Sequence, residues 1–180
     1  NSNDDFGLYY GIIWYMIILG IDPGSVVTGY AIIKTAGAKK NGLEVLDFGC
    51  IITDKFATTG ERLKKIHKET TKLIEKHKPN IISVETLFFF KNLKTVMPVS
   101  QTRGVILLAA AEKKVPVLEF TPLQMKMAIC GYGRAEKKQV QKMIEQMLDL
   151  DSFDFKKNNR KKDDAFDALG VAICAALKAY

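Results

Sequence analysis

The stretch MIILGIDPGSVVTGYAIIK, residues 16–34, decides how the chain begins to fold. An uncharged apolar run leads into Asp22, Pro23, Gly24 and Ser25, and a second apolar run follows almost at once. Asp, Pro, Gly and Ser are preferred turn residues, so the pattern predicts two strands joined by a tight turn. Asp22 is then either ordinary turn chemistry or one ligand of a metal site held at the end of a strand.

The order of the remaining elements indicates an α/β domain. Hydrophobic periodicity predicts strands at 16–22, 29–35, 43–53, 81–85 and 115–120, and helices at 58–77, 94–114, 121–131, 135–150 and 163–179. Three strands followed by alternating helices and strands predict a mixed five-stranded sheet with helices on both faces. Ligands of such sheets lie beyond the strand ends, where Asp22 and Glu85 both stand, so the two carboxylates meet if their strands are neighbours.

The composition limits the class of protein. A length of 180 residues suits one domain, and a net charge of +7 fits either a polyanionic partner or a merely basic surface. Three widely spaced cysteines favour a reduced, intracellular protein, so a cytoplasmic location without a membrane partner is expected. Residues 1–15 make a poor signal peptide and are interpreted as a cloning artefact or an upstream extension, which leaves residues 16–180 as the domain.

The helix at 163–179 carries Asp164 and Asp167, which share one helical face. They could be a solvated acidic first turn that favours the helix dipole, but the rest of the helix is apolar and must pack on the sheet. If they converge with Asp22 and Glu85, each neighbouring pair repels by about 1 kcal/mol at 4 Å in water and by more in a dry cleft. Two Mg²⁺ or Mn²⁺ ions would balance four carboxylates, and all-oxygen ligands argue against zinc or copper.

A two-metal carboxylate site in a basic protein suggests phosphodiester hydrolysis, because this chemistry needs no side-chain nucleophile. The only histidines, His67 and His77, lie ten residues apart on a predicted surface helix and off a common face. We expect both to be solvated rather than catalytic. A Ser-His-Asp or Cys-His mechanism therefore has little support.

Four stretches together resemble the RuvC family of bacterial Holliday-junction resolvases. They are ILGIDPGSVVTGYAII (18–33), ISVETLFFFKN (82–92), QTRGVILLAAAEKKVPVLEFTPLQMKMAICGYGRAEKKQV (101–140) and DDAFDALGVAICAAL (163–177). Each alone is weak, since a D-x-G turn also occurs in the actin and hexokinase class, but four in the correct order are specific. The resemblance implies an RNase H-like fold, a homodimer and Mg²⁺-dependent paired nicking of four-way DNA junctions.

The resemblance also implies the site residues. The acids of the family fall on Asp22, Glu85, Asp164 and Asp167, with two Mg²⁺ per active site and Mn²⁺ as a substitute; pairing Asp163 with Asp167 is a less favoured register. It further implies a branch-migration helicase complex as partner and a location at the nucleoid. The helix at 94–114 is the expected dimer interface, because a two-fold partner needs a self-complementary apolar patch.

A predicted DNA-binding set accompanies the acids. Phe88 matches an aromatic that the family uses against bases at the junction centre, although core packing within its aromatic triplet is the alternative. Lys126 and Lys137 match basic residues that approach phosphates, and Lys91 and Arg134 complete the set. Lysines are usually just surface residues, so these assignments depend on the resemblance.

Two further segments each have two interpretations, either a DNA contact or a plain connection between elements. Gly131-Tyr132-Gly133 precedes a helix predicted to start at Ala135, so its N–H groups either bind a phosphate or form an inter-helix turn. The basic segment KKNNRKK, 156–162, either grips a DNA backbone or is a solvated loop.

Three other functions are alternatives to a junction nuclease. A nuclease for RNA–DNA hybrids would use the same metal chemistry. An actin- or hexokinase-like nucleotide-binding protein would need roughly twice this length and a second phosphate loop. A junction-binding module without catalysis would bind DNA equally well and cleave none.

Overall fold

One five-stranded sheet organises the molecule. The computed structural model describes residues 15–35, 42–86, 93–150, 153 and 162–178, and its strands lie in the order β3-β2-β1-β4-β5. The strands are β1 (Ile17–Asp22), β2 (Val27–Thr35), β3 (Leu43–Ile52), β4 (Ile81–Glu85) and β5 (Val117–Phe120). The helices are α1 (Thr59–His77), α2 (Leu93–Glu112), α3 (Pro122–Cys130), α4 (Lys137–Met147) and α5 (Lys162–Lys178).

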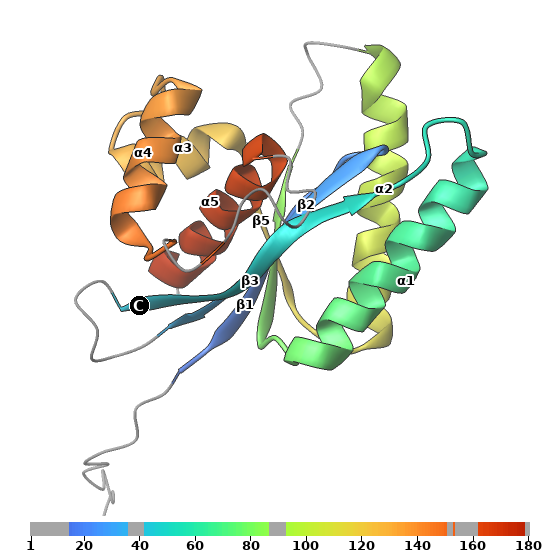
Figure 1. Ribbon diagram of the computed structural model, residues 1–180, viewed down its shortest axis with the longest axis horizontal. Coiled ribbons are helices and arrows are strands. Elements are labelled where there is room, and N and C mark those ends of the chain that lie inside the picture. The colour runs from blue at the N-terminus through green and yellow to red at the C-terminus, as the bar shows by residue number, and fades with distance from the viewer. Residues whose placement is uncertain (1–14, 36–41, 87–92, 151–152, 154–161, 179–180) are drawn as a thin grey trace, which may run out of the picture.

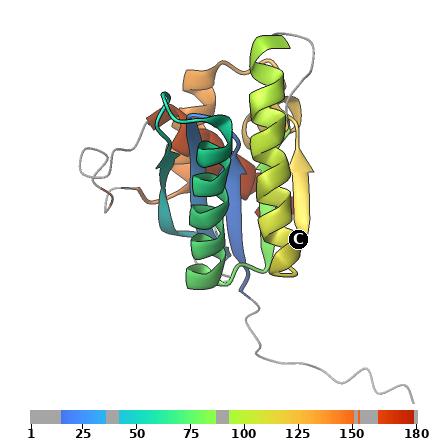
Figure 2. The ribbon, with the colours of Figure 1, turned by 90° about the vertical axis from the view of Figure 1, so that its right-hand side faces the viewer.

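The helices form two layers, one on each face of the sheet. Helices α1 and α2 lie side by side over one face, and α3, α4 and α5 lie over the other (Figures 1 and 2). Strands β1 and β2 are antiparallel, as are β2 and β3, whereas β1 pairs with β4 and β4 with β5 in parallel. The predicted mixed five-stranded sheet with helices on both faces is therefore confirmed.

Alternation along the strands divides the core in two. Leu19 and Ile21 of β1 belong to the core under α1 and α2, whereas Ile18 belongs to the core under α3, α4 and α5. In β4, Ile82 and Val84 face α1 and α2. Because successive strand side chains point to opposite faces, the residues that follow Ile21 and Val84 point toward the α5 side.

Helix α5 lies unusually close to the sheet, and two glycines make this possible. A methyl group added to Gly20 would lie 2.3 Å from the carbonyl oxygen of Ala168. One added to Gly29 would lie 2.0 Å from the carbonyl oxygen of Asp164. The buried Ser83 hydroxyl of β4 also donates to the Val171 carbonyl of α5 at 2.7 Å. These contacts fix where α5 begins relative to β1 and β2.

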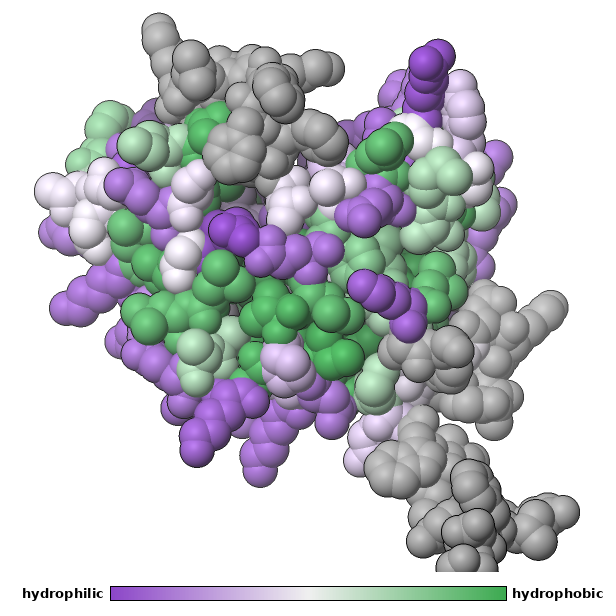
Figure 3. All heavy atoms as spheres, turned by 180° about the vertical axis from the view of Figure 1, so that it is seen from behind, coloured by the Kyte–Doolittle hydropathy of each residue, from purple (hydrophilic) through white to green (hydrophobic). Residues whose placement is uncertain are grey.

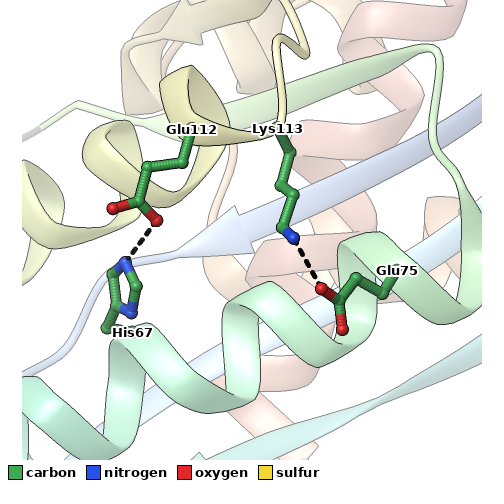
Figure 4. Close-up of polar contacts among 4 residues, drawn as sticks. All are labelled: His67, Glu75, Glu112 and Lys113. Carbon is green, nitrogen blue, oxygen red and sulfur yellow. Dashed lines mark hydrogen bonds and ion pairs between the residues drawn. The ribbon is translucent and has the colours of Figure 1, made fainter.

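Two polar contacts join α1 to the end of α2 and to the residue that follows it (Figure 4). His67 Nε2 lies 2.9 Å from Glu112 Oε2, and the Lys113 ammonium pairs with Glu75. The prediction that both histidines are solvated is wrong for His77, whose side chain is only 12% exposed and lies 3.8 Å from Asp47. Burial lowers the pKa of His77, with neighbouring Lys76 acting in the same direction.

Two predicted element boundaries are wrong for local reasons. Helix α4 begins at Lys137 and not at Ala135, because Ala135 forms a turn to the Tyr132 carbonyl and the Glu136 N–H bonds the Gln139 side chain. It also ends three residues early, where Leu148 adopts an extended conformation. In an extended chain Leu148 and Leu150 point to the same side, and both side chains are buried in the core.

Strand β5 is shorter than predicted, since it begins at Val117 and not at residue 115. Pro116 has no N–H to donate to a neighbouring strand, although its carbonyl accepts from the Ile82 N–H at 2.9 Å. In the part of the chain that the structure describes, no helix has the length and hydropathy needed to cross a bilayer.

Candidate metal centre

Asp22 and Glu85 end two neighbouring parallel strands. The register pairs Ile21 of β1 with Val84 of β4, so the acids follow directly at the same edge of the sheet. Their carboxyl groups share a hydrogen bond. The structure thus brings together two acids that are 63 positions apart in the sequence, as the strand pattern predicted.

The first turns of α5 bring Asp164 and Asp167 to the same edge. Asp22 pairs across the sheet with Gly29, and the Asp164 backbone lies directly over Gly29. Both Asp164 and Asp167 act electrostatically on Asp22, and Asp167 acts on Glu85 as well. All four predicted acids therefore gather around the end of β1, and the role assigned to them stays a prediction.

Burial and mutual repulsion keep this site from carrying its full negative charge. Burial, followed by the charge of Asp167, raises the pKa of Asp22 to about 7. Burial, followed by the charge of Asp22, raises the pKa of Glu85 to about 9. The hydrogen-bonded pair of Asp22 and Glu85 consequently keeps a shared proton at neutral pH. Burial also raises the pKa of Asp167.

Lys137 supplies the second source of neutralisation. Its ammonium lies 2.9 Å from Asp167 Oδ2 and 3.8 Å from Asp163 Oδ2, and Gln141 donates to the other oxygen of Asp163 at 3.0 Å. Burial by itself would lower the pKa of Lys137, but its hydrogen bond to Asp167 and the nearby acids raise it. The first residue of α4 is therefore joined to the first turns of α5 across the acidic site.

The donor set suits Mg²⁺ or Mn²⁺, since its ligands are carboxylate oxygens. In the described ranges no three His, Cys, Asp or Glu side chains are arranged as a ready ligand set for an ion. The acids are instead neutralised by a shared proton and by the Lys137 ammonium, which are the charges that a divalent cation would replace. Burial, with help from Glu85, raises the pKa of the nearby Cys174 thiol to about 12, so this thiol is protonated at neutral pH in the metal-free site.

The other predicted site residues have separate outcomes. Lys126 is half-buried on α3, and Arg134 is exposed in the connection between α3 and α4. Gly131 ends α3 in a left-handed conformation with φ of 67°, as an inter-helix turn would. Phe88 and Lys91 lie outside the described residues, as does segment 156–161. Of the five residues in the predicted DNA-binding set, Lys126, Arg134 and Lys137 therefore lie in the described part of the chain.

The sequence reasoning missed two residues that position the site. Gly29 permits the approach of α5, and Ser83 holds α5 to β4. Both are small residues inside strands: Ser83 lies between the buried Ile82 and Val84, and Gly29 lies between Thr28 and Tyr30. That interruption was the available signal, because a small residue in a strand often marks close approach of another backbone.

The sheet order, the two helical layers and the acids at the ends of β1 and β4 define a nuclease domain of the RNase H-like class. Comparison with known proteins identifies the family, because the model of crossover junction endodeoxyribonuclease RuvC matches residues 18–175. The chain belongs to the RuvC family.

Individual relatives agree with this assignment. Crossover junction endodeoxyribonuclease RuvC of Halothermothrix orenii is 45% identical over 159 residues, which cover 88% of this chain and 91% of the relative. The structure of Thermus thermophilus RuvC in complex with Holliday junction substrate has a TM-score of 0.80 at 29% identity, over 91% of this chain and 94% of that one. The yeast mitochondrial resolvase Ydc2 shares the fold, with a TM-score of 0.67 at 16% identity, over 95% of this chain and 84% of that one.

Proposed function

We propose that this protein is a structure-selective endodeoxyribonuclease that resolves Holliday junctions in DNA recombination and repair. The observation that carries the proposal is the gathering of four acids at one sheet edge in a chain of the RuvC family. The solved RuvC of T. thermophilus with its Holliday junction substrate supports the choice of substrate. The reaction is hydrolysis of one phosphodiester bond in each of two like strands.

Asp22, Glu85, Asp164 and Asp167 would hold two Mg²⁺ ions, or Mn²⁺ in their place. Bound in this way, the metal ions would lower the pKa of the attacking water and stabilise the leaving oxygen. The protein side chains prepare the site for this charge. The Asp22–Glu85 pair holds a proton that it would release to solvent on binding a cation, and Lys137, which lies on Asp167, would be free to bind a DNA phosphate once a cation takes its place.

The positive charge of the protein and the shape of the substrate would determine how DNA is held. A net charge of +7 favours phosphate contacts, which fix the register of the DNA and make binding depend on salt. Lys126, Arg134 and Lys137 are the described members of the predicted DNA-binding set, which Phe88 and Lys91 complete. Junction shape, more than base identity, would then select the substrate.

A second copy of this chain is the proposed partner for α2. Met97, Gln101, Gly104, Leu108 and Ala111 form an exposed row at spacings of four and three residues, so they share one face of the helix. Met97 and Leu108 are 69% and 53% exposed. Apolar residues also gather in a broad area on the back of the molecule (Figure 3). A two-fold dimer through α2 would cover this row and place two acidic sites for paired nicking.

The proposed setting follows from the substrate. A junction resolvase acts in the cytoplasm at the nucleoid, together with a branch-migration helicase complex that moves the junction. Residues 16–180 are the proposed nuclease domain.

Cleavage of three matched substrates tests the function. Purified protein is incubated with a four-way junction, a linear duplex of the same sequence and an RNA–DNA hybrid, with Mg²⁺, Mn²⁺ or EDTA. We expect symmetric nicks in the junction only, no product in EDTA, and retained binding without cleavage for D22N and D164N. Preferential cutting of the hybrid would refute the assignment, and a parent protein that binds but never cleaves would favour a binding module.

A further inference from the structure

Phe56 is the most exposed of the large apolar side chains on the described surface, at 85%. It lies in the connection between β3, which ends at Ile52, and α1, which begins at Thr59. Single exposed apolar residues are common and need no explanation by themselves. The position and the rigidity of Phe56 are what point to a ligand.

The backbone holds Phe56 in one place. Its N–H donates to the Asp54 carboxylate at 2.9 Å, and the N–H of Ala57 donates to the Asp54 carbonyl at 3.2 Å. Thr58 then caps α1 through a reciprocal pair of hydrogen bonds with Glu61. The ring is therefore presented to solvent by a closed turn joined to a capped helix, so little backbone ordering is left for a binding partner to impose.

The same connection is fixed to the turn that follows Asp22. Thr53 is buried, its N–H donates to the Val26 carbonyl at 2.9 Å, and its hydroxyl donates to the Ser25 carbonyl at 3.0 Å. Strand β3 runs parallel to β1, since each is antiparallel to β2. Phe56 therefore stands beyond the same edge of the sheet as Asp22 and Glu85.

Strand spacing gives the separation along that edge. Neighbouring strands lie about 4.8 Å apart, so the end of β3 is roughly 10 Å from that of β1 and roughly 14 Å from that of β4. Successive nucleotides of one strand advance by about 3.4 Å along a duplex. A DNA strand crossing the acids would cover the distance to the end of β3 in about three to four nucleotides, and the turn that carries Phe56 lies just beyond that end.

Lys55 completes a surface that matches DNA. Its ammonium lies 4.9 Å from the centre of the Phe56 ring. A cation beside an exposed aromatic ring fits a nucleotide, which offers a phosphate to one and a base to the other. Apolar side chains that press between base steps partly unstack them.

We propose that Phe56 contacts a base about three to four nucleotides from the cleaved phosphate, with Lys55 on an adjacent phosphate. The inference rests on the proposed junction nuclease and adds an aromatic contact on the arm, separate from the one expected of Phe88. Phe56 is a binding residue in this scheme, and it touches none of the reacting atoms.

A second aromatic–lysine pair provides a matched control. Lys34 lies 4.2 Å from the ring centre of Tyr15, which is 55% exposed, at the opposite end of β1 and β2. Y15A removes a comparable exposed ring far from the acids. It should change nothing in DNA binding if position is what matters.

Junctions carrying 2-aminopurine singly at one to six nucleotides from the cleavage point test the proposal. The full chain is titrated in EDTA, so that binding is read without cleavage. We expect the parent and Y15A to change the fluorescence at the third or fourth position, and F56A to abolish that change. Junction affinity should fall about fivefold or more in F56A, the low end for loss of one base stack, and F56W should restore it.

Two sets of results would overturn the proposed Phe56 contact, and thermal unfolding provides a control. An unchanged fluorescence and affinity in F56A, or an equal loss in F56A and Y15A, would overturn it while leaving the nuclease assignment intact. A parent protein without preference for the junction over duplex would overturn the proposed function and this inference together. Thermal unfolding of F56A should match the parent, since the ring is almost fully exposed.

Discussion

Replacing Asp22 by Asn should stabilise the metal-free protein at alkaline pH. Asp22 and Glu85 both have pKa values raised above their ordinary range, chiefly by burial. Each of them holds a proton in the folded chain at a pH where the unfolded chain has released it. The free energy of unfolding therefore falls as pH rises from about 4.5 through the raised pKa values.

The size of the effect follows from these pKa values. Each proton that the folded chain retains and the unfolded chain has lost costs about 1.4 kcal/mol per pH unit, so one retained proton lowers the free energy of unfolding by about 4 kcal/mol between pH 5 and pH 8. For a chain of this size each kcal/mol shifts Tm by roughly 2–4 °C. D22N removes one charge and relieves Glu85, and it should exceed the parent Tm by about 5 °C at pH 8 and match it near pH 5.

Thermal unfolding in EDTA at half-unit pH steps measures this difference. D163N is the matched control, because Asp163 also belongs to the cluster but its side chain is 68% exposed. Its unfolding curve should keep the pH dependence of the parent. Mg²⁺ should raise the Tm of the parent at pH 8 by more than that of D22N. A parent Tm that is constant or rising across this range would refute the reasoning.

Four further substitutions test separate parts of the structure. G29A should lower Tm strongly, because the new methyl group would meet the Asp164 carbonyl at 2.0 Å and displace α5; calorimetry would show it, and an unchanged Tm would contradict the packing. S83A should lower the free energy of unfolding, measured with denaturant, by about 1 kcal/mol, because its buried hydrogen bond to the Val171 carbonyl is lost; an unchanged value would mean that this hydrogen bond does not stabilise the fold. L108D should shift the molar mass in light scattering from dimer to monomer, whereas an unchanged mass would exclude α2 as the interface. K137M should reduce junction cleavage at least tenfold while K138M, which removes an equally charged neighbour, should not, and equal effects would indicate charge alone.

The sequence predicted the features that depend on local pattern. The apolar run into Asp22-Pro23, the strand ending at Glu85 and the Thr-Pro start of α3 each carry their signal in neighbouring residues, and the structure places elements there. Alternation and parallel pairing then bring Asp22 and Glu85 to one edge. These inferences succeed because strand and helix periodicity are short-range properties.

Features that arise from tertiary packing could not be predicted in this way. The early end of α4 reflects the demand of the core for Leu148 and Leu150, which competes with helical periodicity. The contact of Lys137 with Asp167 joins residues from different helices, so no local sequence pattern predicts it. Phe56 likewise looks like an ordinary loop residue until the position of β3 beside β2 is known.

In the proposed mechanism, four acids from three separate segments of the chain form one divalent metal site. Crystals grown with Mn²⁺ and measured at the manganese absorption edge test it most directly, because anomalous peaks locate the ions without reference to activity. We expect peaks among Asp22, Glu85, Asp164 and Asp167, with the Lys137 ammonium displaced from Asp167. Crystals saturated with Mn²⁺ that show no peak at this edge of the sheet, with Lys137 still on Asp167, would contradict it.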